Sequence, residues 1–406
     1  MSKGSNSTGL RRYNERVLIT ALRKMGQASK LELARLSNLT PQAVTRIIDD
    51  LEASGLVRPE GRRLGGLGQP SMLYTINPQG AYSIGVNVGR RDIQLLLMDF
   101  GGVVVKKIAH EFECPEPDFL LEKIQTGITE LTAHLSPAEV SRLVGVGVAM
   151  PWFMGAWSKE LNMSEDLAQR WNEINFDKEV ARRTRLPVFF ENDCSAAAIA
   201  ELQFGQGIDV ANFLYIFIGT FIGGGVVLEG NLESGVHGNS GALASMPVSP
   251  SRLRSAPEIE GPFETLVNRA SLFVLRRHLN ANGISINSIS QLGSVLPKAK
   301  LYVDEWILDC VDALTFAIFS ATGVLDFEAI VIDANLPQDI IDELVSKVSE
   351  RVKAITPNGV FVPDILRGKI GPDARAIGGA ILPFYANFSP DKTVMLTGGI
   401  PQKIRD

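Results

Sequence analysis

The feature that most constrains the fold is a short apolar run that stops abruptly at three polar residues. Residues 186–190 are all apolar. Glu191, Asn192 and Asp193 follow them, and an alanine-rich segment then continues to residue 201. This order predicts a buried strand, a polar corner and a helix. Open α/β sheets place ligands at the carboxyl ends of such strands, beside helix N-termini, so Asn192 and Asp193 are candidate ligand residues. Asp193 would equally suit a helix cap, and this segment leaves both interpretations open.

A second apolar segment surrounds a glycine-rich turn. Residues 214–228 predict two apolar strands around that turn, and Glu229-Gly230-Asn231 follows them. Together the two segments resemble the ROK family (repressor, open reading frame, kinase). Three further stretches match the same family, at residues 235–241, 261–266 and 370–380. The resemblance spans nearly the whole chain.

The resemblance implies both a fold and a range of functions. ROK members are sugar kinases and sugar-responsive repressors, among them the xylose and N-acetylglucosamine repressors, and they share an actin-like fold. An α/β chain with two similar lobes around one cleft is therefore expected, with a sugar as its ligand. The N-terminal segment and the residues kept at the nucleotide and sugar sites then distinguish a repressor from a kinase.

Three helices are predicted ahead of the lobes. Apolar residues at helical spacing predict a first helix over residues 13–25, after a small polar leader at residues 1–9 that we expect to be disordered. Ser29 and Glu32 match a capping box, which starts a second helix that ends near residue 37. Thr40 suits a cap and Pro41 suits the first helical position, so a third helix is expected to end near residue 54.

The third helix carries the residues expected to contact DNA bases. Its apolar face leaves Gln42, Thr45 and Arg46 on the outer face, and such side chains pair with base edges. Two strand-like segments enclose a basic, glycine-rich turn after Arg62 and Arg63, which predicts a winged helix-turn-helix. A helical protein-interaction module with a solvated charged face is the alternative, and the capped helices and the basic wing favour DNA.

The wing departs from the family pattern at one position. ROK repressors usually carry an Arg just before the wing Pro, and Gln69 stands there in this chain. Insertion of the wing into the minor groove is therefore in question. Arg62 and Arg63 are still placed to contact phosphate.

Charge separates this head from the rest of the chain. Residues 1–76 hold 12 Lys and Arg against 6 Asp and Glu, whereas the whole chain has a net charge of −5. A basic head on an acidic body favours a polyanion as the partner of the head. The apolar runs are too short and too interrupted to span a bilayer, and no signal-peptide pattern precedes them, so we expect a cytoplasmic protein with no membrane partner.

Two α/β lobes are expected after the head. The predicted first-lobe strands are residues 81–88, 92–98, 103–111 and 143–149, with a helix at residues 119–134. Similar strands near residues 213 and 226 and at 329–333, with helices at 264–279 and 303–322, predict the second lobe. The predicted domains are a winged helix-turn-helix DNA-binding domain at 1–76, a first lobe at 77–191 completed by a helix at about 373–390, a second lobe at 192–372 and a tail at 391–406.

Three segments that contact nucleotide in ROK kinases are altered. Arg90 and Arg91 occupy a loop whose small residues normally let backbone N–H groups approach phosphate. Phe221 stands where Gly is usual, and Asp333 begins the segment that replaces a nucleotide-side Gly pair. Phosphoryl transfer depends on positioning and charge stabilisation of the phosphate, so we expect no enzymatic turnover and no cofactor.

The sugar contacts implied by the resemblance are partly kept. Asn192, Asp193 and Glu264 match them, with Asp193 at the position of the kinase general base. Ala242 replaces a sugar-binding Glu, and Ser245 replaces a His that contacts sugar and ligates zinc. The family's three zinc cysteines also have no counterpart, because no Cys lies between Cys194 and Cys310. We therefore expect no metal. His237, in a glycine-rich stretch, is either a ligand contact or a loop residue that faces solvent.

These patterns together predict a transcriptional regulator of the repressor type. It would bind operator DNA through the winged helix and a carbohydrate or polyol effector in the interlobe cleft, as a homodimer or homotetramer that matches paired half-sites. An active sugar kinase with a DNA-binding head and a DNA-binding regulator with a vestigial pocket are the alternatives. The sequence leaves open which sugar and operator are involved, and whether the sugar releases or promotes DNA binding.

Overall fold

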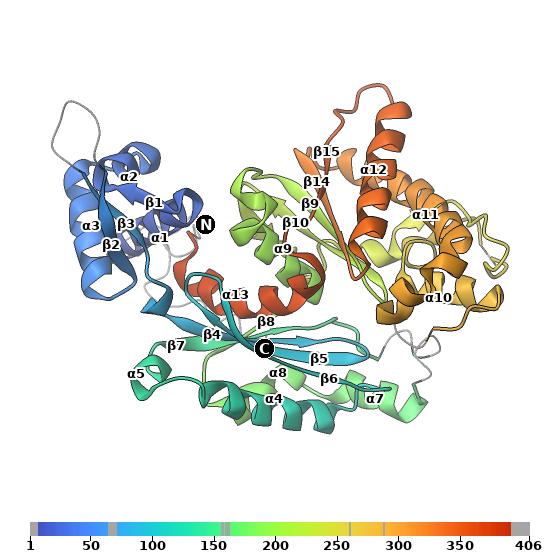
Figure 1. Ribbon diagram of the computed structural model, residues 1–406, viewed down its shortest axis with the longest axis horizontal. Helices are drawn as coiled ribbons and strands as arrows, with labels where there is room; N and C mark the ends of the chain where they lie inside the picture. The colour runs from blue at the N-terminus through green and yellow to red at the C-terminus, as the bar shows by residue number, and fades with distance from the viewer. Residues whose placement is uncertain are drawn as a thin grey trace. The chain divides into compact units, whose positions relative to one another are not determined.

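The computed structural model of the chain describes residues 7–63, 71–155, 158, 163–259, 261–286 and 289–390. Its internal contacts form two compact units (Figure 1). The first unit comprises Met1–Glu191 and Gly379–Asp406, and the second comprises Asn192–Gly378. The predicted boundary at residue 76 falls inside the first unit and stays a prediction. No described helix is long and apolar enough to cross a membrane.

The head of the first unit is a winged helix-turn-helix. Buried Leu18, Leu22, Leu33 and Ile48 form its core. Ser29 and Glu32 form the predicted capping box, and Ala43 N donates to Thr40 Oγ1 at 3.3 Å. Its elements are α1 (Ser7–Met25), β1 (Gln27–Ser29), α2 (Lys30–Ser37), α3 (Pro41–Ala53), β2 (Val57–Arg63) and β3 (Ser71–Ile76), with strand order β1-β3-β2.

The start of the head differs from the sequence-based prediction in the first helix and adds a strand that was not predicted. Helix α1 begins at Ser7, inside the segment that was expected to be disordered, and residues 27–29 form a strand that pairs with β3. In the early part of α1, Arg11 pairs with Glu15 at 3.1 Å and with Asp50 of α3 at 2.5 Å, which joins this part of the helix to α3. The predicted wing turn with Gln69 and the predicted tail at 391–406 lie outside the described residues.

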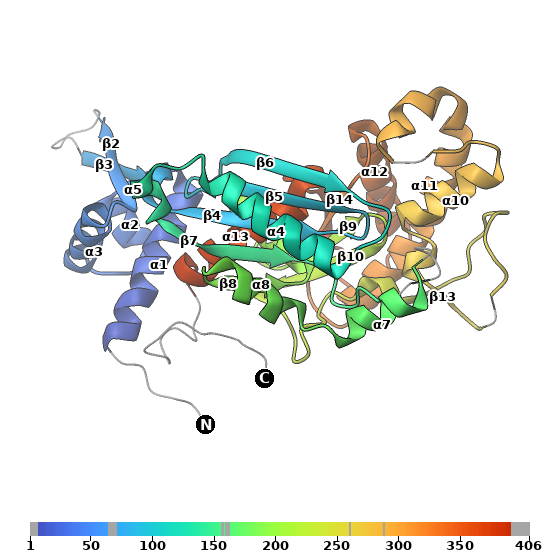
Figure 2. The same cartoon turned by 90° about the horizontal axis from the view of Figure 1, so that it is seen from below.

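The rest of the first unit is a five-stranded mixed sheet of order β6-β5-β4-β7-β8. The helices α4 and α8 cover one face, and Figure 2 shows α4 running across β4 and β5. Helix α13 lies on the opposite face (Figure 1). The bounds are β4 (Tyr82–Val88), β5 (Asp92–Asp99), β6 (Val104–Glu111), α4 (Pro117–Thr132), α5 (Pro137–Val140), β7 (Leu143–Ala149), α7 (Glu165–Glu173), α8 (Phe176–Thr184), β8 (Val188–Glu191) and α13 (Ala374–Phe388).

The second unit is built on a sheet of order β11-β10-β9-β14-β15, in which β9, β14 and β15 are parallel. Helix α9 packs on β9 and β10, and α12 packs on β14 and β15. The bounds are α9 (Asp193–Phe204), β9 (Phe213–Ile218), β10 (Ile222–Leu228), β11 (Asn231–Glu233), β12 (Pro247–Val248), β13 (Glu264–Thr265), α10 (Leu272–Ala281), α11 (Leu292–Thr322), β14 (Ala329–Ala334), α12 (Gln338–Ala354) and β15 (Asp364–Arg367).

Two helix boundaries in the second unit correct the sequence-based prediction. The helix expected at residues 264–279 begins only at Leu272, because Glu264–Thr265 pair with β12 and Ser271 caps the helix by accepting from Val274 N. Helix α11 begins at Leu292, eleven residues before the predicted start at 303. The local helix propensity did not decide these two boundaries. Strand pairing between β12 and β13 decided the first, and the long buried face of α11 decided the second.

Candidate functional site

The polar corner after β8 is the start of α9, and Asn192 caps that helix. Its Oδ1 accepts hydrogen bonds from Cys194 N at 3.0 Å and from Ser195 N at 3.4 Å. The capping role weighed for Asp193 is therefore filled by its neighbour. A ligand contact by Asn192 would come from its amide nitrogen, because the carbonyl oxygen already accepts the two backbone N–H groups.

Asp193 lies next to this cap and is bound to an arginine that the sequence analysis missed. The residue is 6% exposed, and its Oδ2 accepts a hydrogen bond from Arg375 Nη1 at 3.2 Å. The Arg375 guanidinium also lies 4.8 Å from the centre of the Phe217 ring. Arg375 is the only cation in the family-like stretch at residues 370–380. The sequence signal was partial, because a buried carboxylate requires a partner but only the fold determines which arginine supplies it.

Glu264 is buried on the short strand β13 of the same unit. Thr265 N and Asn268 Nδ2 both donate to its Oε1 at 2.8 Å, and these two bonds fix the orientation of the carboxylate. His237 is exposed on the loop after β11, next to exposed Val236. Ligand binding by Asn192, Asp193, Glu264 and His237 stays a prediction.

The three altered nucleotide segments have ordinary structural partners. After β4, Arg90 donates to the carbonyl oxygens of Met154 at 3.3 Å and Phe153 at 3.2 Å. Phe221 packs edge-to-face on Phe273, with ring centres 6.0 Å apart. Asp333, at the end of β14, accepts from Ala334 N and from Gly371 N, and its burial raises the pKa of the carboxyl to about 6. All three side chains are thus held by partners within the protein.

The segment that matches the family's zinc-binding stretch lies beside a loop that is held by a buried arginine. Ala242 and Ser245 border a 3-10 turn, and neither side chain is a zinc ligand. The following loop is instead held by Arg269, which is fully buried. Arg269 donates to Asp309 Oδ1 at 2.8 Å, to Asp312 Oδ2 at 3.3 Å and to the carbonyl oxygen of Ser249 at 2.9 Å. The residues present therefore do not fit a zinc site.

Asp309 completes this cluster, which we call the Arg269 cluster and define as Arg269, Asp309 and Asp312. Ser251 Oγ donates to Asp309 Oδ2 at 2.9 Å, and Arg252 N donates to Oδ1 at 3.1 Å. A charged core thus ties the loop at residues 249–252 to α11. In the described part of the chain, no three His, Cys, Asp or Glu side chains are grouped to hold a metal ion.

We expect the purified protein to contain no stoichiometric zinc, because the described residues group no three possible ligands and no Cys lies between Cys194 and Cys310. Elemental analysis after dialysis without chelator is the measurement, and a bound structural zinc would be retained, given the roughly 10–16 kcal/mol of binding free energy typical of such sites. About one zinc per chain in that sample would contradict the prediction.

The outer face of α3 presents the side chains predicted to contact DNA bases. Val44, Ile47, Ile48 and Leu51 are buried, as the helical spacing predicted. Gln42, Thr45 and Arg46 are exposed. Such a face at the second helix of a helix-turn-helix is the one that enters the major groove.

The basic residues of the wing differ in their surroundings. Arg62 and Arg63 are both exposed on β2, and Arg63 Nη1 pairs with Glu32 Oε1 at 2.5 Å. Hydrogen bonds from Ser29, reinforced by Arg63, lower the pKa of Glu32 to about 2, so this pair is fully charged at neutral pH. A phosphate contact by Arg63 would therefore compete with Glu32, whereas Arg62 pairs with no acidic side chain of the described residues.

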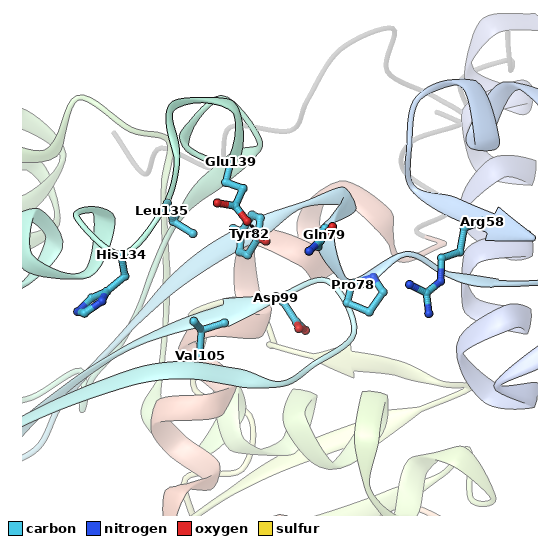
Figure 3. Close-up of a pocket in the computed structure, with 9 residues that line it drawn as sticks. All are labelled: Arg58, Pro78, Gln79, Tyr82, Asp99, Val105, His134, Leu135 and Glu139. Carbon is cyan, nitrogen blue, oxygen red and sulfur yellow. Dashed lines mark hydrogen bonds between the residues drawn. The ribbon is translucent and has the colours of Figure 1, made fainter. Parts of the chain in front are cut away.

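A polar pocket of about 340 Å³ lies at the junction between the head and the first lobe (Figure 3). Tyr82 donates its hydroxyl to Glu139 Oε1 at 2.8 Å, and burial together with this bond raises the pKa of Tyr82 to about 12. None of the predicted ligand or DNA residues lines the pocket. Its lining comprises Arg58, Pro78, Gln79, Tyr82, Asp99, Val105, His134, Leu135 and Glu139.

Comparison with known families decides the identity of the lobes. The ROK family profile matches residues 83–384, about three quarters of the chain. The chain belongs to the ROK family. A profile described as winged helix-turn-helix DNA-binding matches residues 11–58, which cover most of the head.

Individual ROK proteins resemble this chain at low sequence identity. The xylose repressor of Bacillus subtilis is 26% identical over 248 residues, which are 60% of this chain and 62% of the repressor. A glucokinase of Halalkalibacterium halodurans is 26% identical over 318 residues, 74% of this chain and 94% of the kinase. A crystal structure of a ROK family transcriptional regulator, described as a homologue of the Escherichia coli MLC protein, has a TM-score of 0.69 at 21% identity.

That regulator shares the complete architecture. The match covers 96% of this chain and 100% of the regulator, so the head and both units have counterparts in one solved fold. The predicted fold class, a winged helix-turn-helix followed by an actin-like, two-lobed ROK sugar-kinase fold, is confirmed.

Proposed function

We propose that this ROK protein is a sugar-responsive transcriptional repressor that binds operator DNA through α3 and the wing. One observation supports this proposal most strongly. Gln42, Thr45 and Arg46 are exposed on α3, and the head that carries this helix is joined to a ROK fold. Gln, Thr and Arg side chains pair with base edges, whereas a kinase has no use for such a face. The solved structure that matches 96% of this chain, head included, is described as a ROK family transcriptional regulator.

The sugar effector binds in the second unit, at Asn192, Asp193 and Glu264. Two buried carboxylates and a carboxamide offer the acceptors and donors that sugar hydroxyl groups require. His237 is a fourth contact, brought to the sugar by its exposed loop. The altered nucleotide segments argue against phosphoryl transfer, so Asp193 acts here as a binding residue and the kinase alternative is disfavoured.

Operator binding requires two copies of the chain. Paired half-sites match a two-fold symmetric protein, so the working form is a homodimer or homotetramer. The effector acts by its different affinity for the DNA-binding and non-binding states, since only a differential affinity shifts an equilibrium.

Two assays on the wild-type protein test the proposal against its alternatives. A thermal-shift screen with D-xylose, D-glucose and N-acetyl-D-glucosamine should find at least one sugar that raises the melting temperature. A coupled ATP-hydrolysis assay with the same sugars should show no sugar-dependent turnover. ATP-dependent phosphorylation of a sugar would show that the protein is an active kinase. If no sugar of a wider monosaccharide panel raised the melting temperature, a vestigial pocket would be favoured.

We expect Arg46→Ala to weaken binding of specific DNA and to relax its sequence preference. A base contact by a bidentate arginine is worth roughly 1–3 kcal/mol of discrimination. Fluorescence anisotropy with the DNA upstream of the protein's own gene and with a scrambled duplex measures both affinities. Equal losses on the two duplexes would place Arg46 on phosphate.

The matched variant Arg62→Ala/Arg63→Ala separates base contacts from phosphate contacts. It should weaken binding to the specific and the scrambled duplex alike. The slope of log K against log salt concentration should fall by about 1 for each arginine that contacts phosphate. Because Arg63 is paired with Glu32, Arg62 should account for most of the change.

A further inference from the structure

Arg375 is in a position to sense the effector, because it already holds the carboxylate that the sugar would use. We propose that the sugar displaces Arg375 from Asp193, and that helix α13 transmits this change to the DNA-binding head. The inference rests on the proposed function and adds its regulation. Its two ends are the Asp193–Arg375 ion pair in the second unit and, in the first, the contacts of α1 with Phe100 and Ser389 beside the end of α13.

At the sugar end, the effector and Arg375 compete for the same oxygen atoms. The Asp193 and Arg375 side chains are 9% and 16% exposed, so their pairing at 3.2 Å is largely shielded from solvent. Sugar hydroxyl groups that bind Asp193 must donate to the carboxylate in place of the guanidinium. Arg375 also lies on the face of Phe217, so the guanidinium keeps one partner when it leaves Asp193.

Helix α13 is one continuous element that belongs to both units. Its first residues, Ala374 to Gly378, are in the second unit, and the helix continues from Gly379 in the first. Close packing holds it at both places, since a Cβ at Gly378 would overlap the carbonyl oxygen of Ala196 in α9, and one at Gly379 would lie 3.1 Å from that of Val86 in β4. A displacement at Arg375 therefore cannot be absorbed by loose packing around the first turns.

The far end of α13 is linked to the first helix of the head through Phe100 and through Ser389. Phe384 and Phe388 pack on Phe100, with ring centres 5.4 Å and 4.7 Å apart. Arg23 of α1 donates to the carbonyl oxygen of Phe100 at 3.1 Å and lies over its ring. Arg16 of α1 donates to the carbonyl oxygen of Ser389 at 3.0 Å, just after α13 ends. Movement of α13 thus changes the surface on which α1 rests.

The route from sensor to head lies within one short helix, in which Pro383 stands next to Phe384 and marks the place where the helix can bend. Thirteen positions separate Arg375 from Phe388, which is roughly 20 Å at the rise of an α-helix. Rigid elements with two discrete arrangements are the physical carriers of coupling over such distances. The proposal therefore predicts that breaking the ion pair by mutation mimics the effector.

The test compares sugar-free DNA affinities of the full-length protein. The variants are Arg375→Ala, Asp193→Asn, their combination, Arg375→Lys and the control Arg351→Ala, an exposed arginine of α12. The probe is the duplex upstream of the protein's own gene, measured by anisotropy. We expect each single variant at the ion pair to shift the Kd about 5-fold or more, in one direction. The double variant should add nothing further, because both changes break one interaction.

The conservative and control variants exclude a general loss of structure. Arg375→Lys keeps the charge that pairs with Asp193 but loses the planar group that lies on Phe217, so its Kd should fall between those of wild type and Arg375→Ala. Arg351→Ala should match wild type. Unchanged Kd values in properly folded Arg375→Ala and Asp193→Asn would overturn the relay and leave the proposed function intact.

Hydrogen exchange provides a second readout that does not need DNA. Amides at residues 13–24 and 384–389 should exchange faster in Arg375→Ala than in wild type and Arg351→Ala. Identical exchange in all three proteins would overturn the relay on its own. A wild-type protein that does not bind DNA would refute the proposed function, and the exchange result would still decide the relay.

Discussion

Asp309→Asn is expected to destabilise the second unit by about 3 kcal/mol, at the low end of the range for breaking a buried ion pair. Asp309 is the main counter-ion of the fully buried Arg269, and it also fixes the loop through Ser251 and Arg252. Asn keeps the shape but removes the negative charge. Asp312 remains 3.3 Å from the guanidinium, so the positive charge is only partly uncompensated, which places the cost at the low end.

Urea unfolding at neutral pH measures this effect, and Asp304→Asn is its control on the same helix. Asp304 pairs with Lys300 one turn away, where both side chains are about half exposed, so its loss should cost no more than about 1 kcal/mol. An Asp309→Asn protein whose second unit unfolds within about 1 kcal/mol of wild type would show that the Arg269 cluster does not hold the loop.

Asp193→Ala is expected to weaken sugar binding by roughly 1–3 kcal/mol, or about 5- to 100-fold in Kd, because sugar hydroxyl groups would be desolvated without a partner. We expect the lower part of this range. The variant also removes the Arg375 ion pair that a sugar has to break in the wild-type protein. Calorimetry with the sugar that raises the melting temperature most is the measurement.

Asp209→Ala is the matched control for that titration. Asp209 is an exposed carboxylate of the same unit, 3.6 Å from Lys369, and its removal should leave the sugar affinity unchanged. If Asp193→Ala bound the sugar as tightly as this control, the carboxylate would have only the structural role of holding Arg375, and the effector would bind elsewhere.

The head was predictable because its signals are local. Ser29 and Glu32 are three residues apart, Thr40 directly precedes Pro41, and the buried positions of α3 recur at helical spacing. Such patterns depend on neighbouring residues alone. The strands of the first lobe were likewise predictable from alternating and continuous apolar runs, with β7 at the predicted residues.

The electrostatic contacts of the second unit were not predictable in the same way. Asp193 and Arg375 are 182 positions apart, and Arg269 and Asp309 are 40 positions apart. Nothing in the local pattern pairs one acid with one distant arginine, because that choice is made by the packing of whole elements. The sequence did indicate that Asp193 was a candidate site residue, but the identity of its partner required the fold.

The residue that caps α9 was also not predictable from the sequence alone. Asn192 and Asp193 are both favoured caps, and the one that takes the role depends on where the helix begins. The helix begins at Asp193, so Asn192 caps it and the carboxylate of Asp193 is directed to Arg375.

The central claim, that a sugar controls DNA binding by this ROK protein, is tested most directly by one titration. Wild-type protein is titrated into a fluorescent duplex from upstream of its own gene, with and without the sugar that raises its melting temperature, and into a scrambled duplex under the same salt. The account predicts tighter binding to the upstream duplex than to the scrambled one, and a change in the upstream Kd of about 5-fold or more when the sugar is present. Equal affinity for the two duplexes, or an upstream Kd that the sugar leaves unchanged, would contradict it.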